Sequence, residues 1–223
     1  MRTRIFFALV TGAAAIVAVP AQAQDTGIAA GDVLVRLRGI VVAPNEESGP
    51  ILPGIPAGSV TVDDAVMPEV DFTYMATDTI GFELIASSTK HTINGAGAIS
   101  GLGEVASSWV LPPTLTVQYH FAPKSRFRPY VGAGVNYTIF YSGEASPSLV
   151  GALGPTTVKM DDSFGYAVQA GVDLDITDKV FLNFDVKYID MDTTARLNTG
   201  GTVNTIDVSI DPFVFGAGVG FRF

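Results

Sequence analysis

The sequence lacks cysteine and has few charged residues, and both features exclude classes of protein. Without cysteine it can form neither a disulfide framework nor a thiolate metal site. Charged residues make up only 16% of the 223, whereas hydrophobic residues make up 48%, and the mean hydropathy is +0.36. The formal net charge of −9 argues against nucleic acid as a partner, because nucleic-acid binding needs a basic surface.

Long apolar runs are also missing. After residue 23 no stretch approaches the roughly 18 uninterrupted apolar residues of a membrane-spanning helix. Inside lipid, only helices and closed β-barrels satisfy all of their backbone hydrogen bonds. If a chain of this apolar composition lies in a membrane, we therefore expect a barrel.

Residues 1–23 have the pattern of a secretory signal peptide. Arg2 and Arg4 supply the positive start, Ile5–Val19 carries no charge, and Ala21 and Ala23 provide the small residues of a cleavage site. We expect cleavage to leave residues 24–223 as a single barrel domain with a net charge of −11, since two arginines are removed. A retained N-terminal anchor is the alternative.

The remaining sequence alternates between apolar and small or polar residues, which is the period of a β-strand. From Phe164 to Ile176, for example, the even positions are apolar, and the odd positions are small or polar. Several such segments have ten or more residues, which suits a tilted membrane strand of about 9–11 residues. The eight strands predicted are Gly31–Pro44, Pro68–Ala76, Ile80–Lys90, Ser108–Phe121, 131–141, Phe164–Ile176, Val180–Tyr188 and Phe213–Phe223.

The connections between these strands are alternately long and short. The long ones are 45–67, 91–107, 143–162 and 193–204, and the short ones are 77–79, 122–127 and 177–179. Outer-membrane barrels have tight periplasmic turns and longer external loops. We therefore expect an all-β, eight-stranded antiparallel transmembrane β-barrel with long extracellular loops, short periplasmic turns and both chain ends in the periplasm of a Gram-negative cell.

The two faces of the strands predict which side meets lipid. An eight-stranded lumen is only just wide enough for side chains to fill it, so the aromatic face should point outward and the glycine-rich polar face inward. The inward charges would form a lumen network, which acts either as a structural plug or as an ion-selective pore, and the narrow lumen favours the plug. Its expected members are Arg36, Arg38, Glu69, Asp71, Glu83, Asp173, Asp175, Asp185, Lys187 and Arg222.

Five segments resemble the outer membrane protein W family. They are residues 33–39 (VLVRLRG), 115–121 (LTVQYHF), 128–137 (RPYVGAGVNY), 163–167 (SFGYA) and 211–223 (DPFVFGAGVGFRF). The resemblance covers nearly all of the chain after residue 23. It implies an eight-stranded barrel with a narrow, partly apolar interior, uptake of small hydrophobic molecules, and a part in stress responses.

The C-terminal strand resembles the signal by which outer-membrane proteins are recognised for assembly. It ends on Phe223, and Phe221 and Val219 precede it at alternate positions. An edge strand of this kind can pair with the insertion machinery by adding to its sheet. We expect these three residues to direct assembly, although any lipid-facing last strand would show the same pattern.

Apolar residues in two external loops predict a vestibule. They are Ile51, Leu52 and Ile55 in 45–67, and Leu149 and Leu153 in 143–162. Such side chains need shelter from water and could fold over the barrel mouth, or the loops could pack only on themselves. With the family resemblance, we expect passage of small hydrophobic molecules through an apolar mouth with lateral exit into lipid. The expected partners are outer-membrane lipid and lipopolysaccharide, the barrel-assembly machinery and small hydrophobic solutes.

Two other functions stay open at this point. One is a structural or surface-recognition barrel without transport, and the other is an outer-leaflet lipid-modifying enzyme. The enzyme would need a histidine near a serine, and His91 with Ser87, Ser88 or Ser100 is the combination available. We expect no enzyme and no cofactor. A metal site is not expected either, because Asp173, Asp175 and Asp178 lack the glycine and closing glutamate of a calcium loop.

Overall fold

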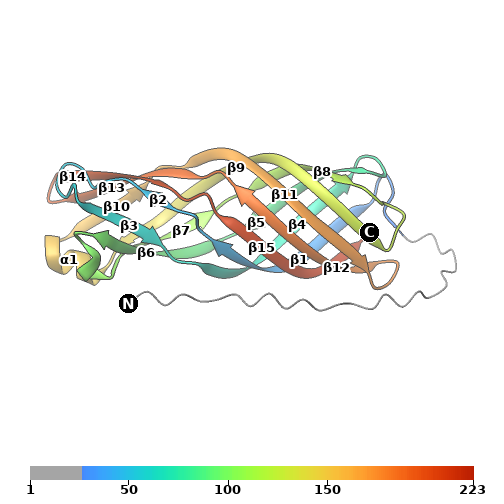
Figure 1. Cartoon of the computed structure of the whole chain (residues 1–223), viewed down its shortest axis with the longest axis horizontal. Coiled ribbons are helices and arrows are strands. Elements are labelled where there is room, and N and C mark those ends of the chain that lie inside the picture. The colour runs from blue at the N-terminus through green and yellow to red at the C-terminus, as the bar shows by residue number, and fades with distance from the viewer. Residues whose placement is uncertain (1–26) are drawn as a thin grey trace.

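Eight antiparallel strands close into a barrel in the computed structural model, which describes residues 27–223 (Figure 1). In order around the ring they are β1 (Val33–Ala43), β4 (Ala65–Met75), β5 (Ile80–Ser87), β8 (Thr114–His120), β9 (Phe127–Ala145), β11 (Ser163–Asp175), β12 (Val180–Ile189) and β15 (Phe213–Arg222). Strand β15 pairs with both β12 and β1, which closes the ring. The predicted barrel is thus confirmed, and the predicted signal peptide lies outside the described residues.

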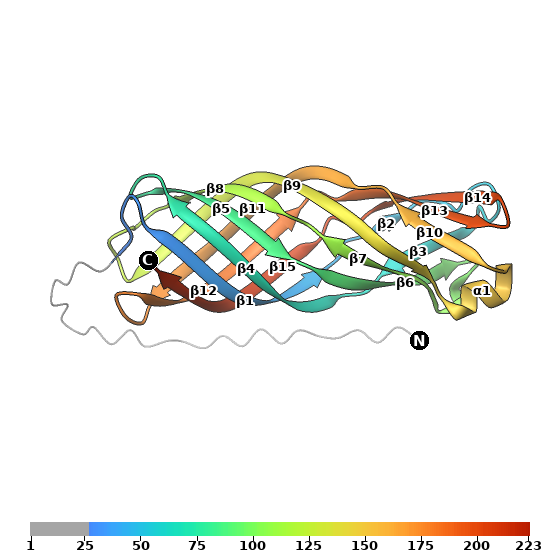
Figure 2. The same cartoon turned by 180° about the vertical axis from the view of Figure 1, so that it is seen from behind.

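The connections expected to be long contain further strands, which extend the barrel at the end opposite the C-terminus (Figures 1 and 2). These are β2 (Glu47–Ser48), β3 (Gly58–Val62), β6 (Thr89–Gly97), β7 (Glu104–Leu111), β10 (Thr156–Met160), β13 (Asp192–Thr199) and β14 (Thr202–Ser209). A 3-10 turn, η1 (Ser100–Leu102), and a short helix, α1 (Pro147–Leu153), lie at the same end. Neither helix has the length and apolar character needed to span a bilayer.

The extension consists of two separate sheets. In one, β3, β6, β7 and the end of β9 are neighbours, and in the other the order is β10, β13, β14, β2. Among residues 27–223 no ladder joins β9 to β10 or β2 to β3. Helix α1 begins after Ser146, whose hydroxyl accepts a hydrogen bond from the Leu149 N–H, and Pro147 suits the first helical position. This capping places Leu149 in the apolar interior, where it is buried.

The two faces of the barrel wall differ as the alternation predicts. Large apolar side chains such as Leu37 and Phe72 are about half exposed on the outside, at 54% and 49%. On the inside, glycines allow close approach: a Cβ at Gly218 would lie 2.0 Å from the carbonyl oxygen of Leu37. A Cβ at Gly220 would lie 2.1 Å from the Phe181 ring. The lumen is therefore crowded at these glycines, and the predicted outward orientation of the apolar face is confirmed.

The segment before β1 closes the end of the barrel that carries the C-terminus. Ile28 is fully buried against Leu34, Met75 and Phe181. Its N–H donates to the carbonyl oxygen of Pro123 over 2.8 Å, and its own carbonyl accepts from the Lys124 ammonium over 2.9 Å. These bonds hold residues 27–32 across the mouth.

Candidate functional site: an apolar chamber above a buried charge cluster

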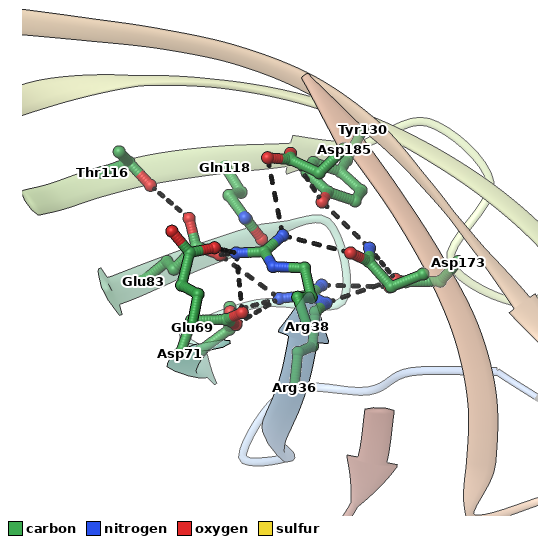
Figure 3. A network of polar contacts seen from close by, with 12 residues as sticks. Arg36, Arg38, Glu69, Asp71, Glu83, Thr116, Gln118, Tyr130, Asp173 and Asp185 are labelled. Atoms are coloured by element: carbon green, nitrogen blue, oxygen red, sulfur yellow. Dashed lines mark hydrogen bonds and ion pairs between the residues drawn. The ribbon is translucent and has the colours of Figure 1, made fainter. Parts of the chain in front are cut away.

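A cluster of buried ionic side chains fills the middle of the lumen (Figure 3). Arg36 on β1 lies at its centre, with Nη1 3.0 Å from Asp71 and Nη2 3.0 Å from Asp173. The guanidinium carbon lies 5.2 Å from the centre of the Tyr130 ring and 5.7 Å from that of Phe181. Paired charges and aromatic faces together offset the cost of removing this cation from water.

The upper layer of the cluster is built around Glu69 on β4. Its Oε1 atom lies 2.8 Å from Nη2 of Arg38 and 3.0 Å from the ammonium of Lys187. Lys187 also donates to Asp185 over 2.7 Å, and Arg38 lies 2.8 Å from Asp71. Alternate positions on neighbouring strands point inward, so the barrel register brings residues far apart in sequence into one layer.

Sequence reasoning missed one member of the cluster, Arg128 on β9. It is fully buried, forms ion pairs with Asp173 and Asp175, and lies under the Phe181 ring. Extending the inward register of β9 back from Gly132 by two steps of two would have found it. Arg222, in contrast, stands apart from the cluster, because its guanidinium donates to the carbonyl oxygen of Asp178 near the C-terminal end.

The cluster combines cations with a larger number of carboxylates. It contains four cations, Arg36, Arg38, Arg128 and Lys187, and six carboxylates, Glu69, Asp71, Glu83, Asp173, Asp175 and Asp185. Glu83 is held further by Thr116 and Gln169, which donate to its Oε2 atom over 2.9 and 2.6 Å. Buried charges bound to one another in a narrow lumen are what a structural plug requires.

On the side of the cluster that faces the extension, the lining of the lumen becomes apolar. One cavity, of about 90 Å³, has walls formed largely by Ile, Val and Met side chains, and Glu69 and Lys187 lie at its base. A second, of about 290 Å³, lies toward the extension. The two share Val60, Val105, Leu197 and Ile206 as lining residues, so they are neighbours. We call the two cavities together the apolar chamber, which extends from the extension to the charge cluster.

Four of the five residues expected in the vestibule line this chamber. Ile51 and Leu149 are buried in its wall, and Ile55 and Leu153 also line it. Leu52 does not: its backbone pairs with Thr205, and its side chain is 47% exposed. Alternation places neighbouring residues on opposite faces, which explains why Ile51 and Leu52 differ.

One side of the chamber wall lacks backbone pairing. The β4–β5 ladder ends at Glu69 and Ser87. On the other side of the gap the β3–β6 ladder begins at Val62 and Ile93, and the Asp63 N–H still donates to the carbonyl oxygen of Thr92 over 3.2 Å. The gap therefore lies between 64–68 and 88–91, which no described backbone hydrogen bond joins. Pro68 lies in the interval and has no N–H to donate. A second interruption follows on the neighbouring strands, where Pro112 and Pro113 separate the β5–β8 and β6–β7 ladders.

The histidines do not form a hydrolytic site in the described part of the chain. The Nδ1 atom of His91 lies 3.4 Å from the carbonyl oxygen of Asp63, and no hydrogen bond joins His91 to Ser87, Ser88 or Ser100. His120 is buried with Gln118, 3.1 Å away, in the lower lumen. Within residues 27–223 no group of three or more His, Asp or Glu side chains is arranged to hold a metal ion.

The expected assembly residues lie on the lipid-facing side of the last strand. Phe223 is 75% exposed, and Phe221 and Val219 are about one third exposed. Phe223 exchanges two backbone hydrogen bonds with Val33, at 2.9 and 3.0 Å, where the ring of strands closes. Their part in assembly stays a prediction.

Comparison with known proteins decides the family. The model of the OmpW family matches residues 29–223. The chain belongs to the OmpW family. Outer membrane protein W of Escherichia coli, a member named for the family, is 38% identical over 196 residues, which are 87% of this chain and 89% of that protein. The family assignment places the barrel in the outer membrane, as expected.

Solved structures agree with this family and fold. The crystal structure of the outer membrane protein OprG from Pseudomonas aeruginosa superposes with a TM-score of 0.82 at 33% identity, covering 88% of this chain and 98% of OprG. A more distant relative from the same species, 28% identical over 76% of this chain and 77% of its own length, is named dibenzothiophene metabolism operon protein PahQ. OprG and the OmpW-family relatives are named as outer membrane proteins and not as enzymes.

Proposed function

We propose that this barrel takes up small hydrophobic molecules from outside the cell, holds them in the apolar chamber and releases them sideways into the outer membrane. The observation that carries the proposal is the apolar chamber, which begins at the tip of the extension and ends on a closed layer of charge. An apolar solute gains about 25 cal/mol per Å² on leaving water for such a wall. The same solute would lose free energy on entering the charge cluster.

The route through the barrel axis is closed twice. Below Arg36 and Arg38 the lumen is filled by ion pairs, and below those Ile28 closes the far mouth. Lateral exit avoids both barriers. The interval above Glu69 and Ser87 is a favourable place for it, because strands without ladder hydrogen bonds can separate at lower cost than paired ones.

The name of the relative PahQ supports a hydrophobic cargo. Dibenzothiophene is a small apolar aromatic compound, and PahQ is named for an operon of its metabolism. A barrel of the same family would serve such a pathway by carrying its apolar substrate across the outer membrane. A structural barrel without transport would have no need for apolar cavities of this kind.

A pair of matched substitutions tests the proposal. Leu153→Asp places a charge in the chamber wall, whereas Leu52→Asp places the same charge on a side chain of similar exposure outside it. We expect Leu153→Asp to lower uptake of a fluorescent apolar probe into lipid vesicles several-fold, since a hydrated carboxylate in the wall removes apolar surface against which the probe is buried. Leu52→Asp should leave uptake near that of the unchanged barrel. Equal uptake by all three proteins, or by empty vesicles, would contradict the proposal.

A further inference from the structure

The base of the chamber contains polar atoms that the protein itself does not satisfy. Glu69 is only 4% exposed, and its Oε1 atom binds both Arg38 and Lys187. No hydrogen bond or ion pair within residues 27–223 involves its other oxygen, Oε2, although Glu69 lines the cavity. A buried carboxylate oxygen facing an apolar space is costly unless something donates to it.

Two residues with hydroxyl groups lie near Glu69 in the cavity wall. Ser87 is the register partner of Glu69, and Thr89 follows on the same face of the chain; both line the cavity. Neither hydroxyl makes a hydrogen bond to another described residue, even though Thr89 is only 7% exposed. Alternation of side chains along the strand brings the two hydroxyls to one side.

Other hydroxyls that line the same cavity are satisfied. Ser108 donates to the carbonyl oxygens of Trp109 and Tyr141, each over 3.2 Å. Thr114 donates to the carbonyl oxygen of Pro112, and Thr193 donates to that of Asp161. In the cavity lining, the described residues offer no hydrogen-bond partner to Oε2 of Glu69 or to the hydroxyls of Ser87 and Thr89, and we call these three residues the polar patch. Other buried polar atoms without a hydrogen bond, such as Nε of Arg38 and of Arg128, lie in the charge cluster below.

We infer that the polar patch is a subsite for the head group of the cargo, and that the cargo is an apolar molecule with one hydrogen-bond donor, an alcohol or an amine. The inference rests on the proposed uptake function and adds the class of substrate. The head group would donate to Oε2 of Glu69, with Ser87 and Thr89 as further partners, while its apolar tail lies along the chamber.

Charge at the base of the chamber argues against an anionic head group. The ammonium of Lys187 is bound by two carboxylates, Glu69 and Asp185, and Arg38 is bound by Glu69 and Asp71. The charge cluster below contains six carboxylates and only four cations. An alkyl carboxylate or sulfate would thus meet a free carboxylate oxygen, and like charges repel strongly where water is excluded.

The test compares probes that share one apolar chain and differ only in the head group. Decanol and decylammonium each carry a donor, decyl methyl ether carries none, and decyl sulfate is an anion. Binding is measured on the isotope-labelled barrel, residues 24–223, in lipid nanodiscs, from amide chemical shifts of Ile85 and Thr89, with each probe concentration corrected for partition into the bilayer. We expect decanol and decylammonium to bind about tenfold more tightly than the ether, the worth of one hydrogen bond to a charged group, and decyl sulfate to bind least.

Three variants assign the effect to the polar patch. Glu69→Gln removes the charge and should abolish the advantage of decylammonium. The double variant Ser87→Ala/Thr89→Val keeps the charge cluster intact and should reduce the preference for decanol over the ether. Glu144→Gln removes the same charge from an exposed side chain outside the cavity and should change neither. Heat-modifiable migration shows which variants are folded, and the double variant carries the test if Glu69→Gln is not.

The outcomes separate this inference from the proposed function. If the ether and decanol bind the unchanged barrel equally, or if the variants keep its order of affinities, the head-group subsite is refuted while uptake of apolar molecules stands. If no probe shifts the chamber amides, the uptake proposal fails together with it.

Discussion

Gly218 shows how single residues decide whether this barrel can close. It faces the lumen on β15, where an added Cβ would lie 2.0 Å from the Leu37 carbonyl oxygen and 2.7 Å from Cα of Arg38. Backbone atoms cannot move aside as a side chain can. Gly39 is the register partner of Ala217 on the lipid-facing side, and a Cβ there would have no neighbour within 4 Å.

These two glycines give a matched pair of substitutions. We expect Gly218→Val to lower the free energy of unfolding by about 3 kcal/mol, the upper end of the usual cost of overpacking, and Gly39→Val to leave it within about 0.5 kcal/mol. Urea unfolding in lipid vesicles, followed by the fluorescence of Trp109, measures both. Similar stability of the two variants would show that the lumen has room that the structure does not give it.

The sequence predicts correctly which single side chains point into the lumen where one face of a strand is uniform. Of the inward charges expected, Arg36, Arg38 and their carboxylate partners lie in one cluster, since strict alternation leaves them no other side. Arg128 was missed because it lies at the very start of its strand, where alternation is short. The contact of Arg222 with Asp178 depends on the turn beside it, which alternation does not describe.

At the scale of elements, the sequence predicts the membrane strands better than the extension. The eight predicted segments overlap the eight barrel strands, because lipid on one side and a crowded lumen on the other impose a clear period of two. Strands β6 and β13 were taken for connections, because Thr89–Gly97 and Asp192–Thr199 are rich in small and polar residues on both faces. In water both faces of such a hairpin can be polar, and the period disappears.

The N-terminal segment is an element whose attachment should depend on pH. The Ala30 N–H donates to Asp78 over 2.9 Å, and the Lys124 ammonium lies 3.3 Å from the same carboxylate. The hydrogen bond from Ala30 and then the contacts with Lys124 hold the pKa of Asp78 below its usual value. The bond to Ala30 is therefore complete above the ordinary aspartate pKa of about 3.9 and is lost as the pH falls through the lower value of the folded barrel.

Amide chemical shifts measure this directly. We expect the Ala30 amide to titrate at a pH below about 3.9, and Asp78→Asn to remove that titration. The Ile28 amide serves as a control in the same spectra, because its acceptor is the carbonyl oxygen of Pro123, which does not titrate. Identical pH profiles for the two amides would show that Asp78 does not hold the segment.

The interrupted β4–β5 wall is the element on which lateral exit depends. Continuing the register past Glu69 and Ser87 would set Pro68 opposite Ser88, and both side chains are exposed. Since the chain has no cysteine, Pro68→Cys/Ser88→Cys would add the only pair available for a disulfide. Phe72 and Leu84, register partners on the intact part of the same ladder, provide the control pair.

We expect oxidation of the Pro68→Cys/Ser88→Cys barrel to lower uptake of an apolar probe several-fold, and reduction to restore it. The Phe72→Cys/Leu84→Cys barrel should be indifferent to oxidation, because its strands are already joined by ladder hydrogen bonds. Uptake is followed by fluorescence in vesicles, and electrophoretic migration shows whether the disulfide has formed. Full uptake by the oxidised Pro68/Ser88 pair would exclude this part of the wall as the exit.

At the scale of the whole molecule, the proposed function depends on closure of the ring of strands. Pairing of β15 with β1 closes the ring and brings Gly218 beside Arg38, which belongs to the charge cluster. The last residue completes this pairing, because Phe223 exchanges two backbone hydrogen bonds with Val33 and leaves its ring 75% exposed. The predicted recognition of this strand by the insertion machinery would use the same edge that pairs with β1 in the closed ring.

Deleting Phe223 should accordingly reduce assembly in the cell more than it reduces the stability of barrels already formed. We expect several-fold less heat-modifiable barrel in the outer membrane, since recognition of the last strand and two closing hydrogen bonds are lost together. Phe164→Ala removes an aromatic side chain that is 73% exposed on β11 and should leave assembly close to normal. If the barrel without Phe223 accumulates like the unchanged one, the last residue is only another lipid-facing aromatic. If Phe164→Ala lowers assembly to the same extent, lipid-facing aromatics matter wherever they lie.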